Sequence, residues 1–183
     1  MSNQPRAAKI LISLVISMTV AAAVLMALDN QSISAGAFSL ASYSSLRPIS
    51  SVTAARRGSS SDRWNRIEVF YSKTSGGNIK QLASLSGLAS PEDVNFHFLV
   101  CNSLGAIDGQ IETTEKWLNQ WSALPGGTWY GTSSTIRICV IGIEKSSEQS
   151  DYQLTRTSEL VEALSRKFSI PNSQISYPTG WKL

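Results

Sequence analysis

The chain has 183 residues with a formal net charge of +3, which is enough for one folded domain preceded by a tail. The charge is unevenly distributed: from Arg63 onward 11 Lys and Arg residues balance 11 Asp and Glu residues, so the whole surplus lies upstream. A nucleic-acid-binding domain carries its positive charge on the folded part, and the composition therefore argues against a nucleic-acid partner.

The first predicted element is the apolar run Ile10–Leu28, which contains no charged residue and follows a basic N-terminus at residues 1–9. At about 1.5 Å per residue, a helix of this length spans the hydrocarbon core of a bilayer. A cleavable signal peptide usually has a shorter apolar stretch, about 7–15 residues long. We therefore expect a transmembrane anchor, although the small residues at positions 35–37 leave a cleaved signal peptide as the alternative.

Both alternatives place the rest of the chain outside the cytoplasm, because basic flanks of an apolar segment stay on the cytoplasmic side. The expected location is therefore the extracytoplasmic side of a membrane, in the periplasm or cell envelope. Residues 29–62 are rich in serine and poor in acidic residues. Such a composition is typical of a flexible linker, so we expect the folded domain at residues 63–183.

Short runs rich in β-branched and aromatic residues, bounded by turn formers, predict the strands of this domain. They lie at residues 67–72, 96–102 and 135–142, with a further short strand at residues 109–112. The segment NIKQLASLSGL, between the first two strands, predicts a helix that ends near Gly87.

A longer helix is predicted from Ser150 to Phe168, with Ser150 and Gln153 as a capping box and Pro171 beyond its end. Its apolar residues recur at helical spacing and predict one face packed on a sheet: Leu154, Val161, Leu164 and Phe168. Because strands and helices alternate along the chain, we expect a single α/β domain with a mixed central β-sheet flanked by helices.

Residues suited to metal binding or nucleophilic catalysis are scarce. A catalytic zinc site needs about three protein ligands around one point, but His97 is the only histidine and lies between two phenylalanines in a predicted strand. We interpret His97 as a structural residue. Cys101 and Cys139 lie in apolar runs, which favours buried free thiols over a disulfide, although the sequence leaves their pairing open. No G-x-S-x-G nucleophile motif is present.

The order of the segments resembles a known enzyme family. The segments are TSGG, VNFHFLV, DGQIE, LPGGTWYGT, IRICVIG and LSRKFSIP. In this order and spacing they resemble the zinc-dependent N-acetylmuramoyl-L-alanine amidases, which cleave peptidoglycan and share their fold with phage lysozyme-type amidases and peptidoglycan recognition proteins. The resemblance covers about residues 64–178 and implies the same fold.

The positions that carry the chemistry of this family are altered in the chain. In the family the first strand typically ends in His-His-Ser-Ala-Thr, with its first histidine on zinc, whereas the matching stretch here is FYSKT and begins with Phe70. The catalytic tyrosine of the family corresponds to Phe96. The second zinc histidine corresponds to Pro178, and the third ligand has no counterpart before Leu183.

The resemblance therefore implies a membrane-tethered amidase-like domain that is catalytically inactive, holds no zinc or other cofactor, and binds peptidoglycan or a muropeptide. The expected ligand-binding residues lie around the altered metal position: Tyr71, Lys73, Trp129 and Tyr130. Two alternatives stay open. One is a protein–protein interaction module of an envelope complex, and the other is an active peptidoglycan amidase with displaced metal ligands, against which the shortage of histidine argues.

Overall fold

The computed structural model divides the chain into two units, residues 1–38 and 39–183. It describes residues 46–56, 58, 63–124, 133–143 and 149–181 of the second unit, and residues 15 and 17–19 of the first. Most of the predicted anchor Ile10–Leu28 thus lies outside the described residues. Its four described residues, 15 and 17–19, are helical and exposed. Within the described part of the chain, no helix is long and apolar enough to cross a membrane.

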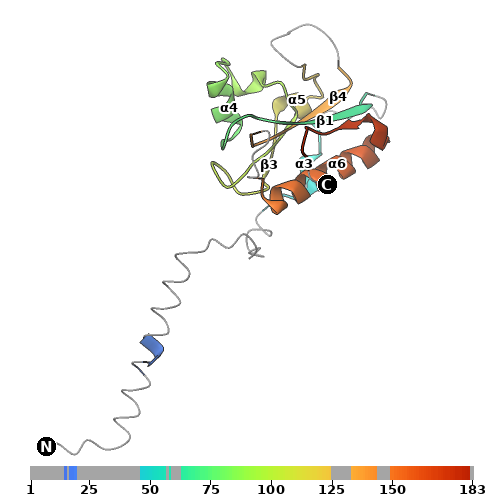
Figure 1. Cartoon of the computed structure of the whole chain (residues 1–183). Coiled ribbons are helices and arrows are strands. Elements are labelled where there is room, and N and C mark those ends of the chain that lie inside the picture. The colour runs from blue at the N-terminus through green and yellow to red at the C-terminus, as the bar shows by residue number, and fades with distance from the viewer. Residues whose placement is uncertain are drawn as a thin grey trace, which may run out of the picture. The chain divides into compact units, whose positions relative to one another are not determined.

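The second unit is a mixed α/β domain built on a five-stranded sheet, which confirms the predicted fold class (Figure 1). The strands are β1 (Arg66–Tyr71), β2 (Phe98–Val100), β3 (Ile111–Thr113), β4 (Thr135–Val140) and β5 (Ile175–Ser176). Their order is β3-β2-β4-β1-β5, and only β3 runs antiparallel to its neighbour. The sequence predicts the first four strands, whereas β5 is too short to show a strand pattern.

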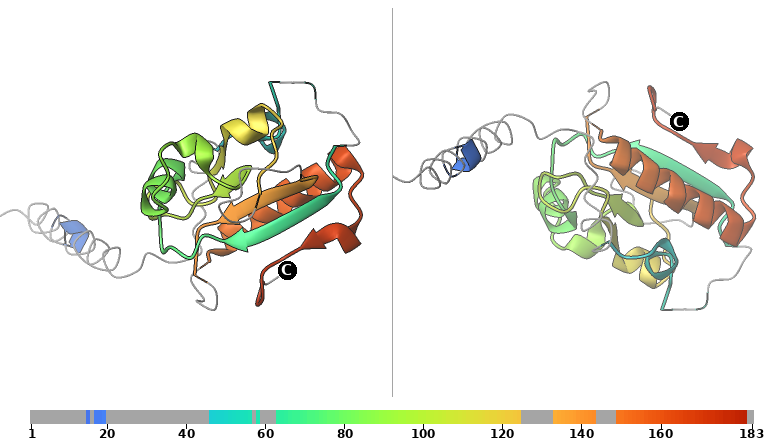
Figure 2. Two further views of the ribbon diagram at one scale, coloured as in Figure 1. Left: turned by 90° about the horizontal axis from the view of Figure 1, so that it is seen from above. Right: turned by 90° about the horizontal axis from the view of Figure 1, so that it is seen from below.

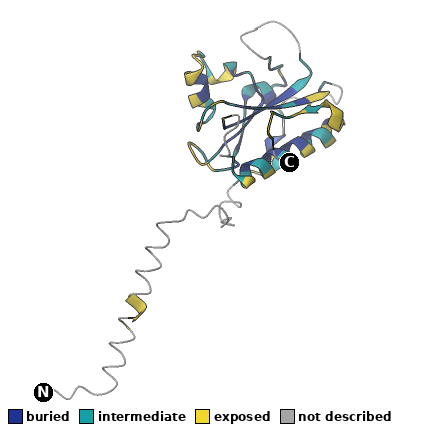
Figure 3. Ribbon diagram, viewed as in Figure 1, coloured by how far each residue is buried: buried dark blue, intermediate teal, exposed yellow. Residues whose placement is uncertain are grey.

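One face of the sheet is covered by α6 (Asp151–Phe168), whose buried side faces the strands (Figure 3). The buried residues of α6 are Gln153, Arg156, Thr157, Leu160, Val161, Leu164 and Phe168. The predicted face is thus confirmed for its last three members, while Leu154 is only half-buried at its margin. Gln153 faces the sheet, and successive residues of an α-helix are rotated by about 100° around its axis. The Leu154 side chain therefore points to the side of the helix rather than into the core.

Only one of the two hydrogen bonds of the predicted capping box forms at the N-terminus of α6. The Ser150 hydroxyl accepts a hydrogen bond from the Gln153 N–H at 2.9 Å. The Gln153 side chain does not complete the box but donates instead to the carbonyls of Val100, at 3.2 Å, and Ile141, at 2.9 Å. Buried amide groups need hydrogen-bond partners. Through these two bonds the Gln153 side chain links α6 to the ends of β2 and β4.

The opposite face of the sheet is only partly covered. The helix α4 (Ile79–Leu85) and the 3₁₀ turn η1 (Pro91–Asp93) lie over β2, and α5 (Glu115–Leu118) follows β3. A second, smaller core forms beneath them, consisting of Leu82, Ala83, Val94, Phe96, Leu99, Cys101, Cys139 and Ile141. Figure 2 (left) shows β1 and β4 from this side with α6 behind them, and no described helix crosses β1 there.

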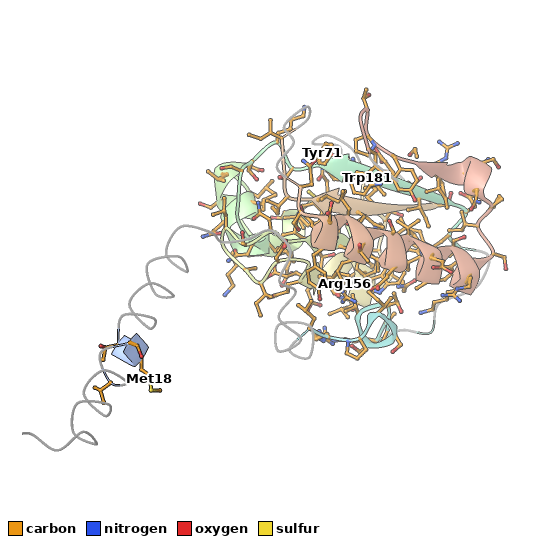
Figure 4. The ribbon with its side chains drawn as sticks, turned by 60° about the horizontal axis from the view of Figure 1, so that its bottom comes forward. Met18, Tyr71, Arg156 and Trp181 are labelled. Atoms are coloured by element: carbon orange, nitrogen blue, oxygen red, sulfur yellow. The ribbon has the colours of Figure 1, made fainter. Side chains whose placement is uncertain are left out.

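Residues 46–56, which the sequence analysis assigns to the linker, are folded onto the domain. They contain α3 (Ile49–Val52), and Val52 is 1% exposed within the larger core. The buried Arg156 of α6 donates from Nη2 to the Arg47 carbonyl at 2.9 Å (Figure 4). The three-residue spacing of Ile49 and Val52 gives this segment one apolar side, which its serine-rich composition conceals.

The C-terminus of α6 offers a test of the backbone geometry. Ser169 caps the helix with φ 55° and ψ 37°, in the left-handed region that favours glycine. We expect Ser169→Gly to raise the free energy of unfolding by roughly 1 kcal/mol, because the Cβ of any other residue is unfavourable there. Urea unfolding measures the change. Ser169→Ala is the control, and an equal effect of both substitutions would show that the hydroxyl, not the backbone, matters.

Candidate functional site

Two of the three positions that the sequence analysis links to the family's active site, Phe70 and Phe96, are in contact on one face of the sheet. Phe70 ends the half-buried side of β1, and its ring centroid lies 6.5 Å from that of the buried Phe96. β5 pairs with β1 so that Ile67 is opposite Ile175. The pairing ends at Glu68 and Ser176, and Pro178 lies beyond β5, where its carbonyl accepts the Trp181 N–H at 3.2 Å. The structure therefore brings Phe70 and Phe96 together, whereas Pro178 follows the edge strand β5, which is separated from β2 by β1 and β4.

An ion pair lies beside Phe70 on the same face of the sheet. The Arg137 Nε of β4 is 2.8 Å from Glu68 Oε2 of β1, and Arg137 Nη1 donates to the Asn95 carbonyl at 2.8 Å. The guanidinium carbon of Arg137 lies 4.4 Å from the centroid of the Phe70 ring, a cation–π distance. Arg137 is 5% exposed, so these partners replace the water that its charge has lost.

A polar groove of about 330 Å³ opens beside this ion pair on the uncovered face of β1, β4 and β5. It is lined by Arg66, Glu68, Ser133, Thr135, Arg137 and Ser176. The Arg66 side chain also contacts Gln174 Oε1 at 3.3 Å. We call this the open-face groove. It combines guanidinium, carboxylate and hydroxyl groups, which suits a polar ligand with its own donors and acceptors.

The four ligand-binding residues predicted from the sequence are placed differently. Tyr71 is buried on the α6 side of β1, opposite to Phe70, and its ring centroid lies 5.9 Å from that of Trp181 (Figure 4). Lys73 follows in the exposed turn with φ 64°. The structure does not bring Tyr71 and Phe70 to the same face, because successive residues of a strand alternate sides. Trp129 and Tyr130 lie outside the described residues.

His97 is held in the core by the backbone through both ring nitrogens. Its Nε2 donates to the Trp121 carbonyl at 2.9 Å, and its Nδ1 accepts the Arg137 N–H at 2.9 Å. This arrangement requires a neutral imidazole. Burial, first of all, lowers the pKa of His97 from 6.5 to about 4, and the charge of Arg137 acts in the same direction. In this position the imidazole is a structural link between the end of α5 and β4.

The two cysteines are free thiols on the α4 side of the sheet. Burial raises the pKa of Cys101 to about 12 and also raises the pKa of Cys139. A thiol with a raised pKa is a poor nucleophile and metal ligand, because both roles require the thiolate. In the part of the chain that the structure describes, no group of three or more His, Cys, Asp and Glu residues is arranged to hold a metal ion.

Sequence reasoning missed the open-face groove, although it contained a signal for the groove's central pair. Arg137 is the only charged residue in the apolar segment IRICVIG, and a charge in a buried strand requires a partner. Glu68 alternates with apolar residues in the first strand. The sequence alone did not show that these two strands are neighbours, a fact that the register Glu68↔Arg137 supplies.

The chain matches no protein-family model and no curated protein.

Proposed function

We propose that the domain is a catalytically inactive amidase-like module that binds peptidoglycan or a muropeptide through the open-face groove. The observation that supports this most directly is the contact between Phe70 and Phe96, whose ring centroids lie 6.5 Å apart. Phe70 was matched to a zinc ligand and Phe96 to the catalytic tyrosine from sequence alone, and the helix α4 separates them in the chain. Chance similarity of short segments gives no reason for these two residues to meet in the fold.

Loss of catalysis follows from the chemistry of the replacements. Zinc hydrolases polarise the scissile carbonyl and activate a water through a metal held by nitrogen, sulfur or oxygen ligands. Phenylalanine and proline side chains offer none of these atoms. Of the remaining candidates, His97 is buried with both ring nitrogens hydrogen-bonded, and the two cysteines are buried thiols with raised pKa values.

The groove retains the chemistry to hold a polymer of sugars and short peptides. A muropeptide presents hydroxyls, amides and carboxylates. The exposed guanidinium of Arg66 can pair with a carboxylate, since planar bidentate recognition is the common mode of this side chain. Glu68 and the hydroxyls of Thr135 and Ser176 accept or donate to sugar hydroxyls. Peptidoglycan lies outside the cytoplasm, which agrees with the proposed orientation of an anchored chain.

The test is binding by the full-length protein to insoluble peptidoglycan and to a soluble disaccharide–peptide. We expect cosedimentation with the polymer, no stoichiometric zinc by mass spectrometry of metals, and no release of peptide. Arg66→Gln should weaken binding of the soluble fragment roughly tenfold, the scale of one charge-assisted hydrogen bond.

Arg166→Gln is the matched control, because Arg166 is an exposed arginine on α6, on the other side of the sheet from the groove. Equal binding by both variants would remove the groove from the proposal. One tightly bound zinc per chain with chelator-sensitive hydrolysis would overturn the inactive-amidase account altogether. Failure to bind peptidoglycan would favour the protein–protein alternative.

A further inference from the structure

The antiparallel strand β3 forms an edge of the sheet, and no backbone group of the described residues pairs with its outer side. β3 pairs with β2 in the register Leu99↔Glu112. On either side of this pair, the Thr114 N–H donates to the His97 carbonyl and the Cys101 N–H donates to the Gln110 carbonyl. Hydrogen-bonded pairs in an antiparallel ladder alternate with non-bonded pairs. The N–H and C=O groups of Ile111 and Thr113 therefore point away from β2, toward the outside of the sheet.

A groove of about 680 Å³ runs along this edge. All residues from 110 to 115 line it, so the groove follows the whole length of β3 and its flanks. One wall is formed by Leu46 and Arg47, and the other by the start of α4 and by η1. The edge thus has the form of a slot in the plane of the sheet, bounded on both faces, in which the outward backbone groups of β3 form the floor.

The wall on the α4 side carries an excess of negative charge. Glu92 and Glu112 line it with a single lysine, Lys80. Glu112 is fixed there, because its Oε2 accepts the Ile79 N–H at 3.0 Å. The other wall combines the apolar Leu46 with the cation Arg47, so the negative charge is confined to the α4 side. An extended segment in the slot would present alternate side chains to the two walls. Basic residues facing Glu92 and Glu112, alternating with apolar residues facing Leu46, complement this distribution.

We propose that β3 accepts an extended segment of a partner protein as a sixth strand, and that this segment carries lysine or arginine at alternate positions. The main-chain groups of Ile111 and Thr113 supply the hydrogen bonds of this pairing, and the two walls select the side chains, as in other cases of strand addition. This site is separate from the open-face groove, which lies on β1, β4 and β5. The proposal therefore stands or falls independently of peptidoglycan binding.

The decisive substitution is Thr113→Pro in the full-length protein. Proline removes the outward N–H and is tolerated on an edge strand when that N–H faces solvent. Thr113→Val is the matched control, because both substitutions remove the hydrogen bond from the Thr113 hydroxyl to the Val52 carbonyl. The probe is a blocked, fluorescently labelled seven-residue peptide in which lysine and valine alternate. We expect Thr113→Pro to raise its Kd at least tenfold above that of Thr113→Val, as measured by anisotropy.

Further measurements test the charge preference and the strand pairing, and distinguish a partner segment from a second copy of the chain. A peptide with glutamate in place of lysine should bind at least several-fold more weakly, and N-methylation of alternate peptide amides should abolish binding. Amide hydrogen exchange at Ile111 and Thr113 should slow on addition of the lysine peptide. The proposal is overturned if this peptide does not bind at ~1 mM, or if Thr113→Pro and Thr113→Val bind it equally. It is also overturned if the protein is a dimer that Thr113→Pro dissociates, because a second copy then occupies the slot.

Discussion

Lowering the pH from 6.5 to 4 should reduce the free energy of unfolding of the domain through His97 alone by about 3 kcal/mol. The unfolded chain binds a proton at this residue with the ordinary pKa of 6.5, whereas the folded domain does so only near pH 4. Across this interval the unfolded state holds the additional proton, so stability falls as the pH falls. The contribution is fully present above pH 6.5 and is lost below pH 4.

The physical cause is that protonation would place a charge in the core and break a hydrogen bond. Nδ1 accepts the Arg137 N–H and cannot do so once it carries a proton. Besides burial, the charges of Arg137, Lys116 and Arg63 disfavour the imidazolium, whereas the Trp121 carbonyl favours it. Burial is the largest of these effects.

Urea unfolding at a series of pH values measures this loss, with His97→Gln as the reference. Glutamine cannot titrate, so the carboxylates of the domain supply the only pH dependence of the variant. The difference between the two proteins should therefore change by about 3 kcal/mol between pH 6.5 and pH 4. If the free energy of unfolding of the two proteins has the same dependence on pH, His97 is not held neutral in the folded domain.

The parts of the fold that the sequence predicted are those with strong local patterns. β1, β4 and α6 have continuous alternation or helical spacing, and their boundaries lie within two residues of those predicted. β2 is shorter than predicted, because the ring of His97 accepts the Arg137 N–H and the regular strand begins only at Phe98. α3 was missed because four residues carry too little periodicity, and its place depends on distant partners in α6.

In the candidate site, too, features with a local sequence pattern could be predicted, and features that depend on distant segments could not. Phe70 and Phe96 could be singled out by comparison with a known motif, and their proximity is a consequence of strand order that local patterns do not contain. The alternation of β1 could have shown that Phe70 and Tyr71 face opposite sides of the sheet. The edge of β3 could not have been recognised, because which strand ends a sheet depends on pairings between segments far apart in the sequence.

Removal of Glu68 should destabilise the domain more than removal of its partner Arg137. The Arg137 side chain is 6% exposed, whereas that of Glu68 is 37% exposed. Glu68→Ala leaves a buried guanidinium without its counter-ion, and breaking a buried pair in this way costs about 3 kcal/mol at the lower end of the usual range. The Asn95 carbonyl and the Phe70 ring remain as partners and place the cost at that lower end.

Arg137→Met should cost only about 1–2 kcal/mol, because the remaining carboxylate of Glu68 is reached by water and methionine fills the space over Phe70. The double variant should be as stable as Arg137→Met to within about 0.5 kcal/mol, since the loss of Glu68 matters only while the guanidinium is present. Urea unfolding of the three variants at neutral pH gives the full cycle. If Arg137→Met is the more damaging substitution, the guanidinium stabilises the fold by its own packing and hydrogen bonds. In that case the stability of the fold does not depend on Glu68 as a counter-ion.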